Sequence, residues 1–261
     1  MTASPHQRKT PMTDTFYIVQ HEPGFESEPL PVWSDREGQV NPFEDRDLSG
    51  IRRVDIPEVP GAFQMLDILS STEADRFVAI AESLGFHEDA PVSLPHSVRH
   101  NQNLNWVVSE AIDGVFWERS RHLLTKRVNG EHVRGINARF RFYRYGVGDF
   151  FKPHSDGAWP SSQVVDGQLV ADAHPGLLSQ YSYLIFLSDG YEGGRTEFLV
   201  SRADPGKPAA RRDDVETVPV QTPKGAVLCF PHGHHPLHCI HAGEPIRSGT
   251  KYIIRTDILY G

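Results

Sequence analysis

The residues with the clearest chemical potential are a histidine and an aspartate two positions apart, His154 and Asp156. In an extended backbone, residues i and i+2 project to the same side, so both side chains could reach one metal ion. A second imidazole from later in the chain would complete a set of two histidines and one carboxylate, which leaves positions of an octahedral Fe(II) open. By itself a His-x-Asp sequence often arises by chance, and a surface turn is then the commoner explanation.

Support for a metal site comes from His241 and from Lys251, the tenth residue after it. Lys251 begins an otherwise apolar segment, and a lysine in that position usually extends its ammonium group into solvent. Here it follows a turn that contains histidine and glycine, at a spacing that would bring the ammonium near the metal. It could then pair with the distal carboxylate of a dicarboxylate cosubstrate.

Arg255 is a second candidate for that carboxylate. It lies four residues after Lys251, on the same face of the expected strand. The two residues are then about 13 Å apart along the strand, so both cannot bind one carboxylate. Arg255 is therefore expected to bind substrate or to pair with Asp257, and it would replace Lys251 as the anchor if the register differs.

A cluster of histidines offers an alternative metal site. Five of the 14 histidines fall close together: His232, His234, His235, His238 and His241. With Cys239 they could hold zinc, although structural zinc sites usually use thiolates or well-spaced histidines. The favoured interpretation is that only His241 binds the metal and that the others line the loop before it.

Three motifs occur in a fixed order along the chain. They are Tyr-Gly-Val-Gly-Asp-Phe-Phe-Lys-Pro-His-Ser-Asp at 145–156, Gly-Gly-Arg-Thr-Glu-Phe at 193–198, and His-Ala-Gly-Glu-Pro-Ile-Arg-Ser-Gly-Thr-Lys at 241–251. On these motifs the chain resembles the Fe(II)- and 2-oxoglutarate-dependent dioxygenases of the prolyl 4-hydroxylase-like group. The resemblance covers residues from about 67 to 260 and leaves the first 55 outside it.

The resemblance implies that His154, Asp156 and His241 bind iron and that Lys251 anchors 2-oxoglutarate. It also implies a double-stranded β-helix, or jelly roll, with O₂ as the second cosubstrate and ascorbate as a reductant in vitro. Many relatives carry a tyrosine three residues before the first histidine, where this chain has Phe151. The tyrosines that could bind 2-oxoglutarate instead are Tyr145, Tyr181 and Tyr183, with Tyr183 preferred.

The reaction that the resemblance implies is hydroxylation of an unactivated C–H bond, with succinate and CO₂ as coproducts. Halogenating relatives have a small residue where this chain has Asp156, so the carboxylate favours hydroxylation. The substrate is expected to be a prolyl or other residue of a polypeptide, or a small metabolite. Two alternatives from other classes are a non-catalytic metal-binding β-barrel and a zinc-stabilised interaction domain.

The elements that must position these residues are two helices followed by many short strands. Ser70 and Glu73 form a capping box before an apolar stripe that ends at Gly85, which predicts a helix over 71–84. A second helix is expected after Ser109, with Lys126 and Arg127 at its C-terminal end. Strands are expected at 139–145, 181–187, 196–200, 215–220, 226–230 and 251–259. The predicted fold class is α+β and mainly β, a jelly roll with supporting helices N-terminal to it.

Three segments are expected to lie outside these helices and strands. The first 60 residues hold eight of the 20 prolines, which predicts an extended Pro-rich arm over 1–55. Residues 56–261 then form one oxygenase domain, with helices in 67–130 and the barrel in 135–261. The polar stretch 99–105 is expected to be a loop, and 157–179 is long enough to be a lid over the site.

Composition limits the remaining possibilities. The 261 residues carry 34 acidic against 26 basic side chains, and this acidic balance argues against binding of nucleic acid. No apolar run is long enough to span a bilayer, and no secretory signal is visible, so no membrane partner is expected. Two cysteines, Cys229 and Cys239, favour a reducing compartment and a cytoplasmic location. The expected partner is a small-molecule or peptide substrate, and the oligomeric state stays open.

Overall fold

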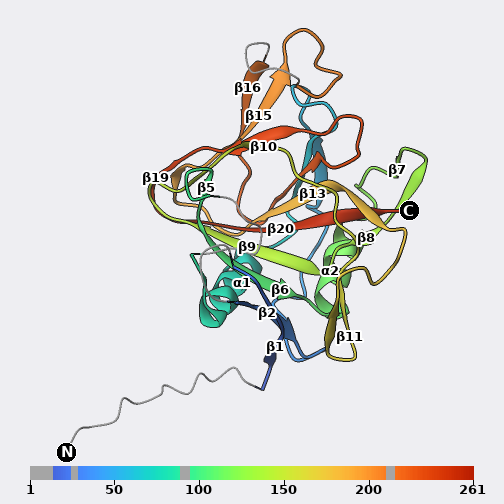
Figure 1. Ribbon diagram of the computed structural model, residues 1–261, viewed down its shortest axis with the longest axis vertical. Coiled ribbons are helices and arrows are strands. Elements are labelled where there is room, and N and C mark those ends of the chain that lie inside the picture. Colours follow the sequence, from blue (N-terminus) through green and yellow to red (C-terminus); the bar gives the residue numbers. More distant parts are fainter. Residues whose placement is uncertain (1–13, 25–28, 89–94, 210–214) are drawn as a thin grey trace, which may run out of the picture.

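The computed structural model describes residues 14–24, 29–88, 95–209 and 215–261. Within these residues the chain builds two main β-sheets of unequal size, with two α-helices on the outer side of the larger one (Figure 1). In the figure the helices lie below strands β9 and β20, and strands β10, β15 and β16 of the smaller sheet lie above them. The mainly β architecture predicted from the sequence is confirmed.

The larger sheet forms the centre of the molecule. Its strands run in the order β1 (Phe16–Glu22), β2 (Leu30–Asp35), β6 (Gln102–Val107), β9 (Arg139–Tyr145), β20 (Lys251–Tyr260), β13 (Leu178–Phe186), β17 (Val227–Pro231), β4 (Phe63–Leu66) and β3 (Arg52–Asp55). Strand β8 (Glu131–Ile136) also pairs with β20 and with β7 (Arg127–Val128). Because β20 lies between β9 and β13, its side chains stand in the middle of the fold.

The smaller sheet brings together segments that are far apart in the sequence. Its order is β16 (Val215–Val220), β15 (Thr196–Ser201), β18 (Ile240–Gly243), β10 (Phe150–His154) and β5 (Arg99–His100). Two short strand pairs complete the described strands: β11 (Gln163–Val165) with β12 (Gln168–Val170), and β14 (Glu192–Gly193) with β19 (Ile246–Ser248). The direct pairing of β10 with β18 is the contact on which the functional site depends.

The two faces of the larger sheet have different neighbours. On β9, Phe140 and Phe142 face the helices and join a core that contains Trp106 and Phe116. Their neighbours in the strand, such as Arg141, alternate with them and face the smaller sheet. The central strands are therefore buried on both faces; β9 still alternates in sequence, whereas β13 shows little alternation of apolar and polar residues.

Helix α1 (Ser71–Leu84) is confirmed at both ends. The Ser70 hydroxyl accepts from the backbone N–H of Glu73, and the Glu73 carboxylate accepts from the backbone N–H of Ser70, which completes the capping box. Gly85 ends the helix at a φ of 94°, a backbone conformation that a residue with a Cβ atom rarely adopts.

Helix α2 (Glu110–Ser120) is shorter than the sequence predicted. Arg127, expected at its C-terminal end, belongs instead to β7. The reason is the pair Asn129 and Gly130, whose φ angles of 51° and 89° form a two-residue turn that joins β7 to β8. No helix in the described part of the chain has both the length and the apolar character needed to cross a membrane.

A buried ion pair links the two helices. Arg119 of α2 donates to both carboxylate oxygens of Glu73 at 2.7 and 2.8 Å. Burial acts to raise the pKa of Glu73, but hydrogen bonds from Arg119 and from the backbone of Glu44 and Ser70 outweigh it and lower the pKa to about 2. The pair therefore holds α1 against α2 on the outer side of the larger sheet.

The sequence predicted an extended arm over 1–55, but the described part of this segment, residues 14–24 and 29–55, contains strands of the larger sheet; residues 1–13 and 25–28 lie outside the described residues. Strands β1, β2 and β3 belong to the larger sheet, and β2 runs parallel to β6 with Trp33 opposite Trp106. The Asp35 carboxylate completes this contact by accepting from Trp106 Nε1 at 2.8 Å and from the Ser109 hydroxyl at 2.6 Å. The three strands are seven, six and four residues long, too short for a period to stand out among the prolines.

The polar stretch 99–105 also differs from the loop that was predicted, because β5 and most of β6 lie in it. Asparagine is uncommon in strands, which made a loop the natural prediction. In β6, however, Asn103 and Asn105 alternate with Leu104 and Trp106, which are buried in the core. The amides line a polar cavity on the other face of the strand, and this explains their presence in it.

Candidate metal centre and the adjoining cavity

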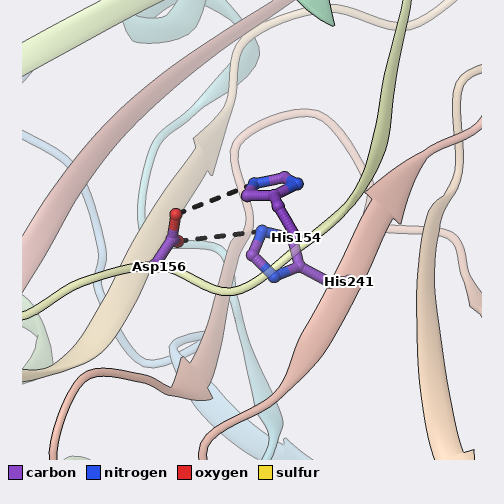
Figure 2. A group of neighbouring side chains, drawn as sticks. All are labelled: His154, Asp156 and His241. Carbon is purple, nitrogen blue, oxygen red and sulfur yellow. Dashed lines mark ion pairs between the residues drawn. The ribbon is translucent and has the colours of Figure 1, made fainter. Parts of the chain in front are cut away.

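The predicted metal-binding residues lie on two neighbouring strands of the smaller sheet. Strand β10 ends at His154, β18 carries His241, and their antiparallel pairing places the two histidines opposite each other. Asp156 follows β10 and turns its carboxylate toward both imidazoles (Figure 2). One ligand atom from each residue lies within 4.8 Å of the others, and no other group of this kind occurs among the described residues.

The charge states of these three groups suit a cation. His154 Nδ1 donates to the Lys152 carbonyl at 2.8 Å, which leaves Nε2 with its lone pair 3.7 Å from Asp156. Burial, followed by the nearby His154, lowers the pKa of His241 to about 3, so this imidazole is neutral at pH 7. Burial opposes the charge of Asp156, but Arg255 and the histidines outweigh it and hold its pKa below the ordinary range. Two neutral imidazoles and a carboxylate fit a divalent metal ion.

A chain of hydrogen bonds holds the Asp156 carboxylate from behind. Ser182 donates to Asp156 Oδ2 at 2.6 Å and accepts from His232 Nδ1 at 2.8 Å. His232 Nε2 accepts from the Ser179 hydroxyl at 2.7 Å, and that hydroxyl accepts from the backbone N–H of Trp159 at 2.8 Å. Because each hydroxyl donates only once, the chain runs in one direction and fixes His232 with its proton on Nδ1.

Aromatic rings cover the two histidines. Phe151 stacks on His154 with ring centroids 3.5 Å apart and an angle of 16° between the planes. Phe230 lies 4.5 Å from His241, measured between ring centroids. The imidazoles therefore contact apolar surface on these sides, which limits the access of water to the candidate ligands.

A cavity of about 260 Å³ opens beside the three residues, between the two main sheets. Lys251 lies in its wall, almost fully buried and opposite Tyr145 in the pairing of β9 with β20. Its ammonium donates to the Gly194 carbonyl at 2.6 Å and lies 5.1 Å from the ring centroid of Phe186. Burial lowers the pKa of Lys251 to about 8, so the group is mostly charged at pH 7 and can bind a carboxylate.

Arg255 lines the same cavity at a different place. Its guanidinium lies 3.4 Å from Asp156 and 3.2 Å from Asp257, the partner expected from the sequence. Lys251 instead donates to the backbone at Gly194. The two cations of β20 thus belong to separate parts of the cavity, one beside the candidate metal ligands and one further from them along the strand.

The tyrosines divide between the two faces of the sheet. Tyr145 lines the cavity, whereas Tyr183 is fully buried on the helix face of β13, 6.4 Å from the ring of Phe116. Tyr181 shares that face and packs against His235. The preference for Tyr183 was wrong because β13 is buried on both faces, so its sequence did not show which residues point to the cavity.

The histidine cluster does not assemble as a zinc site. Both ring nitrogens of His232 are occupied by serine hydroxyls, and His235 Nδ1 accepts from the backbone N–H of Leu237 at 2.9 Å. His234 is exposed. Within the described residues, His241 is the member of the cluster that joins a group of potential metal ligands.

Several residues around the site were not predicted from the sequence. Ser179 and Ser182 support Asp156 only through the pairing of β13 with β17 and the loop after it, and no local motif marks them. His232 belongs to the histidine cluster that was expected to line the loop, and its hydrogen bond to Ser182 was not predicted. Trp159 lies in the segment 157–179 that was expected to be a lid, and it lines the cavity. The same segment contains the short strands β11 and β12.

Comparison with known proteins gives similarity in structure but not in sequence: no family model and no curated protein matches the chain. A prolyl hydroxylase from Trichoplax adhaerens, solved with a peptide fragment of the hypoxia inducible factor oxygen degradation domain, superimposes with a TM-score of 0.50 and 15% identity. The match covers 80% of this chain and 83% of that one. It establishes the fold, a jelly roll of the kind found in prolyl hydroxylases.

Two further structures are similar at lower scores. The viral collagen prolyl hydroxylase of Paramecium Bursaria Chlorella virus-1, in complex with 2-oxoglutarate, has a TM-score of 0.46 and 18% identity, and the match covers 81% of this chain and 96% of that one. A prolyl-4-hydroxylase from Pseudomonas putida has a TM-score of 0.45 and 14% identity, with 76% and 91% covered. The fold that the resemblance implied is confirmed by the Trichoplax adhaerens structure alone.

Proposed function

We propose that this protein is an Fe(II)- and 2-oxoglutarate-dependent dioxygenase that hydroxylates an unactivated C–H bond, with succinate and CO₂ as coproducts. The observation that carries the proposal is the meeting of His154, Asp156 and His241 in the wall of a cavity that also contains Lys251. His154 and Asp156 are far in the sequence from His241 and Lys251, so the meeting of the two pairs is a property of the fold.

His154, Asp156 and His241 would hold the iron. Bound Fe(II) supplies the oxidising chemistry together with 2-oxoglutarate and O₂, because a set of two histidines and one carboxylate leaves coordination positions open for them. The protein's own contribution is to keep the imidazoles neutral, to keep the carboxylate charged and to cover the histidine rings with Phe151 and Phe230.

Lys251 would bind the distal carboxylate of 2-oxoglutarate. Its ammonium is buried beside Tyr145, which lines the cavity, whereas Tyr181 and Tyr183 do not. This supports Tyr145 as the tyrosine that would donate to the same carboxylate. Arg255 would serve instead to fix Asp156, since it lies 3.4 Å from that carboxylate. Phe151 carries no hydroxyl for this purpose.

The direct test measures conversion of 2-oxoglutarate to succinate by purified protein with Fe(II), ascorbate and O₂. Wild-type protein is expected to form succinate slowly even without a second substrate. His154→Ala and His241→Ala should abolish both succinate formation and tight iron binding. His234→Ala is the matched control, because His234 belongs to the histidine cluster but is exposed, and it should retain both properties.

Two outcomes would contradict the proposal. Stoichiometric zinc that Fe(II) does not displace in an anaerobic preparation would favour the zinc-stabilised interaction domain. Iron binding that is lost in the two histidine variants, but without any turnover of 2-oxoglutarate by the wild type, would favour a non-catalytic metal-binding barrel.

A further inference from the structure

A second cavity lies next to the one beside the candidate metal ligands, along the larger sheet. The two share four wall residues, which are Arg99, Arg141, Tyr143 and Trp159. The second cavity has a volume of about 310 Å³, and its remaining walls come from β1, the residue after it, β6 and β9: Gln20, Glu22, Pro23, Asn103, Asn105 and Arg139. Nearly all of these side chains are polar, and the cavity reaches solvent beside Gln20 and Pro23, which are exposed.

The walls of the two cavities, taken together, carry more positively than negatively charged side chains. The arginines are Arg99, Arg139, Arg141 and Arg255. Of the carboxylates, Glu22 pairs with Arg139, and Asp156 belongs to the candidate metal ligands. Glu244 lies near Lys251 and pairs with Arg195 and Arg247. Arg255 contacts both Asp156 and the fully buried Asp257, and Arg141 shares Asp257 with it.

Arg141 is one of three arginines in these walls, with Arg139 and Arg255, that have a buried N–H group without a hydrogen-bond partner among the described residues. It is 5% exposed, and its Nη1 lies 3.3 Å from Asp257. Its Nη2 is buried without a hydrogen-bond partner among the described residues. Its guanidinium lies 4.4 Å from the centroid of the Trp159 ring. Burial lowers the pKa of Arg141, and the positive charge of Arg255 opposes the help from Asp257. A buried N–H donor without a hydrogen-bond acceptor lowers the stability of the folded protein unless a ligand accepts from it.

We infer that the molecule oxidised at this site is a small carboxylic acid whose carboxylate binds Arg141 while its chain extends toward His154 and Asp156. The inference rests on the proposed function and names the substrate class for it. A guanidinium presents two parallel N–H groups that match a carboxylate, and one of the two nitrogens of Arg141 is still without an acceptor. Asn103 and Asn105 add neutral polar groups on the same wall.

A small molecule fits this space better than a stretch of polypeptide. The two volumes, about 260 and 310 Å³, are close to the lower limit for small-molecule sites, and Arg141 itself is buried between the two cavities. The two carboxylates in the reaction would not compete for one anchor. Arg141 lies opposite Arg255 in the β9–β20 pairing, and Arg255 is about 13 Å along the strand from Lys251.

The experiment measures succinate formation by the iron-loaded wild-type protein with a panel of free amino acids and short aliphatic carboxylic acids. Each acid is tested beside its own primary amide, which has the same shape but no charge. At least one acid is expected to raise succinate formation well above the rate without substrate, and its amide is not. The same acid should raise the melting temperature of the metal-free protein, a measurement of binding that is independent of turnover.

Arg141→Gln tests the assignment of the anchor. The KM for the stimulating acid is expected to rise roughly tenfold to a hundredfold, since a charged hydrogen-bond pair is lost. Arg144→Gln is the matched control on the same strand, because Arg144 faces the helices and pairs there with Glu82 of α1. This control should behave as the wild type. The comparison of acid with amide needs no variant, so it remains decisive if Arg141→Gln does not fold.

Each contrary result has a separate meaning. Stimulation by prolyl peptides or by the amides, with none by the acids, would overturn the inference and leave the proposed function intact. An unchanged preference for the acid in folded Arg141→Gln would overturn the role of Arg141. Absence of succinate with every compound and without substrate would contradict the proposed function itself.

Discussion

At the scale of single residues, the Asp156 carboxylate is the most constrained group of the site. One oxygen accepts from Ser182 and the other lies beside Arg255, so the carboxylate cannot rotate freely. The serine is in turn oriented by His232, which is fully buried. Loss of a group that orients a metal ligand typically weakens metal affinity by roughly tenfold to a hundredfold.

Replacement of this serine should therefore weaken iron binding without unfolding the protein. For Ser182→Ala the dissociation constant of Fe(II) is expected to increase roughly tenfold to a hundredfold. Ser120→Ala is the matched control, because Ser120 is equally buried but donates to the Phe116 carbonyl within α2. Anaerobic iron titration measures both. Equal affinities in the two variants would show that Ser182 does not orient Asp156.

Substitutions of Lys251 and Arg255, the two cations of β20, should affect different binding constants. Lys251→Met is expected to raise the KM for 2-oxoglutarate by roughly tenfold or more with little change in iron affinity, because a charged hydrogen bond to the distal carboxylate is lost. Arg255→Gln should weaken iron affinity first, because Arg255 contacts Asp156. Measurement of both constants in both variants tests the assignment, and the reverse pattern would make Arg255 the anchor.

Binding of 2-oxoglutarate should weaken at alkaline pH. Burial lowers the pKa of Lys251 to about 8, so the ammonium is present below that pH and is lost as the pH rises through it. The KM for 2-oxoglutarate is therefore expected to rise by close to tenfold for each pH unit above about 8. Lys251→Arg provides the control, since a guanidinium stays charged and should flatten the profile. A wild-type KM that is constant up to about pH 9 would exclude Lys251 as the titrating anchor.

At the scale of elements, the sequence predicted strands better than it predicted their faces. For β9 the sequence predicted both the ends of the strand and which residues share a face, because Phe140 and Phe142 contrast with the polar residues between them. Strand β13 gave no such contrast, since helices cover one face and the smaller sheet the other, and Tyr183 was placed on the wrong one. Asn103 and Asn105 led to the prediction of a loop where the structure has a strand. Polar residues that line a cavity from a strand look like a loop in the sequence.

The ion pair between α1 and α2 should be a strong contributor to stability. Arg119→Met leaves the Glu73 carboxylate buried without its main partner, and a loss of about 3 to 5 kcal/mol in the free energy of unfolding is expected. Arg121→Met is the control, because Arg121 forms an exposed pair with Glu118 and should cost less than about 1 kcal/mol. Urea unfolding of both variants provides the comparison.

The ion pair between Glu73 and Arg119 predicts that the free energy of unfolding decreases at acid pH. The pKa of Glu73 falls from its ordinary value of 4.5 to about 2 on folding, so the stabilisation is complete above about pH 4.5 and is lost as the pH falls toward 2. Wild-type protein should lose more stability over this range than Arg119→Met does. Parallel acid profiles for the two proteins would show that Glu73 is not responsible.

At the scale of the whole molecule, the N-terminal strands belong to the same sheet as β20, which carries Lys251 and Arg255. Asp35 joins β2 to Trp106 of β6 and to Ser109 before α2. Asp35→Ala is expected to lower the free energy of unfolding by about 2 to 3 kcal/mol, since it leaves buried donors unpaired. Asp45→Ala, at an exposed position, should change it by less than about 0.5 kcal/mol. Equal stabilities would mean that β2 adds little to the sheet.

The local sequence thus predicted the capped helix, the fold class and the grouping of the three candidate metal ligands, because each depends on residues close together in the chain or on a motif with a fixed spacing. The second cavity could not be predicted in this way. Its walls combine β1 with β6 and β9, and the parallel pairing of β2 with β6 that brings them together leaves no local pattern. The serine and histidine behind Asp156 likewise meet only after the sheet has formed.

The rigidity of β20 has a consequence for the regiochemistry of the reaction. Lys251 and Arg255 occupy fixed positions on one hydrogen-bonded strand, and Arg141 is held opposite Arg255 on the next. A substrate anchored at Arg141 would present to the metal whichever carbon lies at the matching distance from its carboxylate. Homologous acids that differ by one methylene group should therefore be hydroxylated at the same number of bonds from the acid, rather than at the same distance from the other end of the chain.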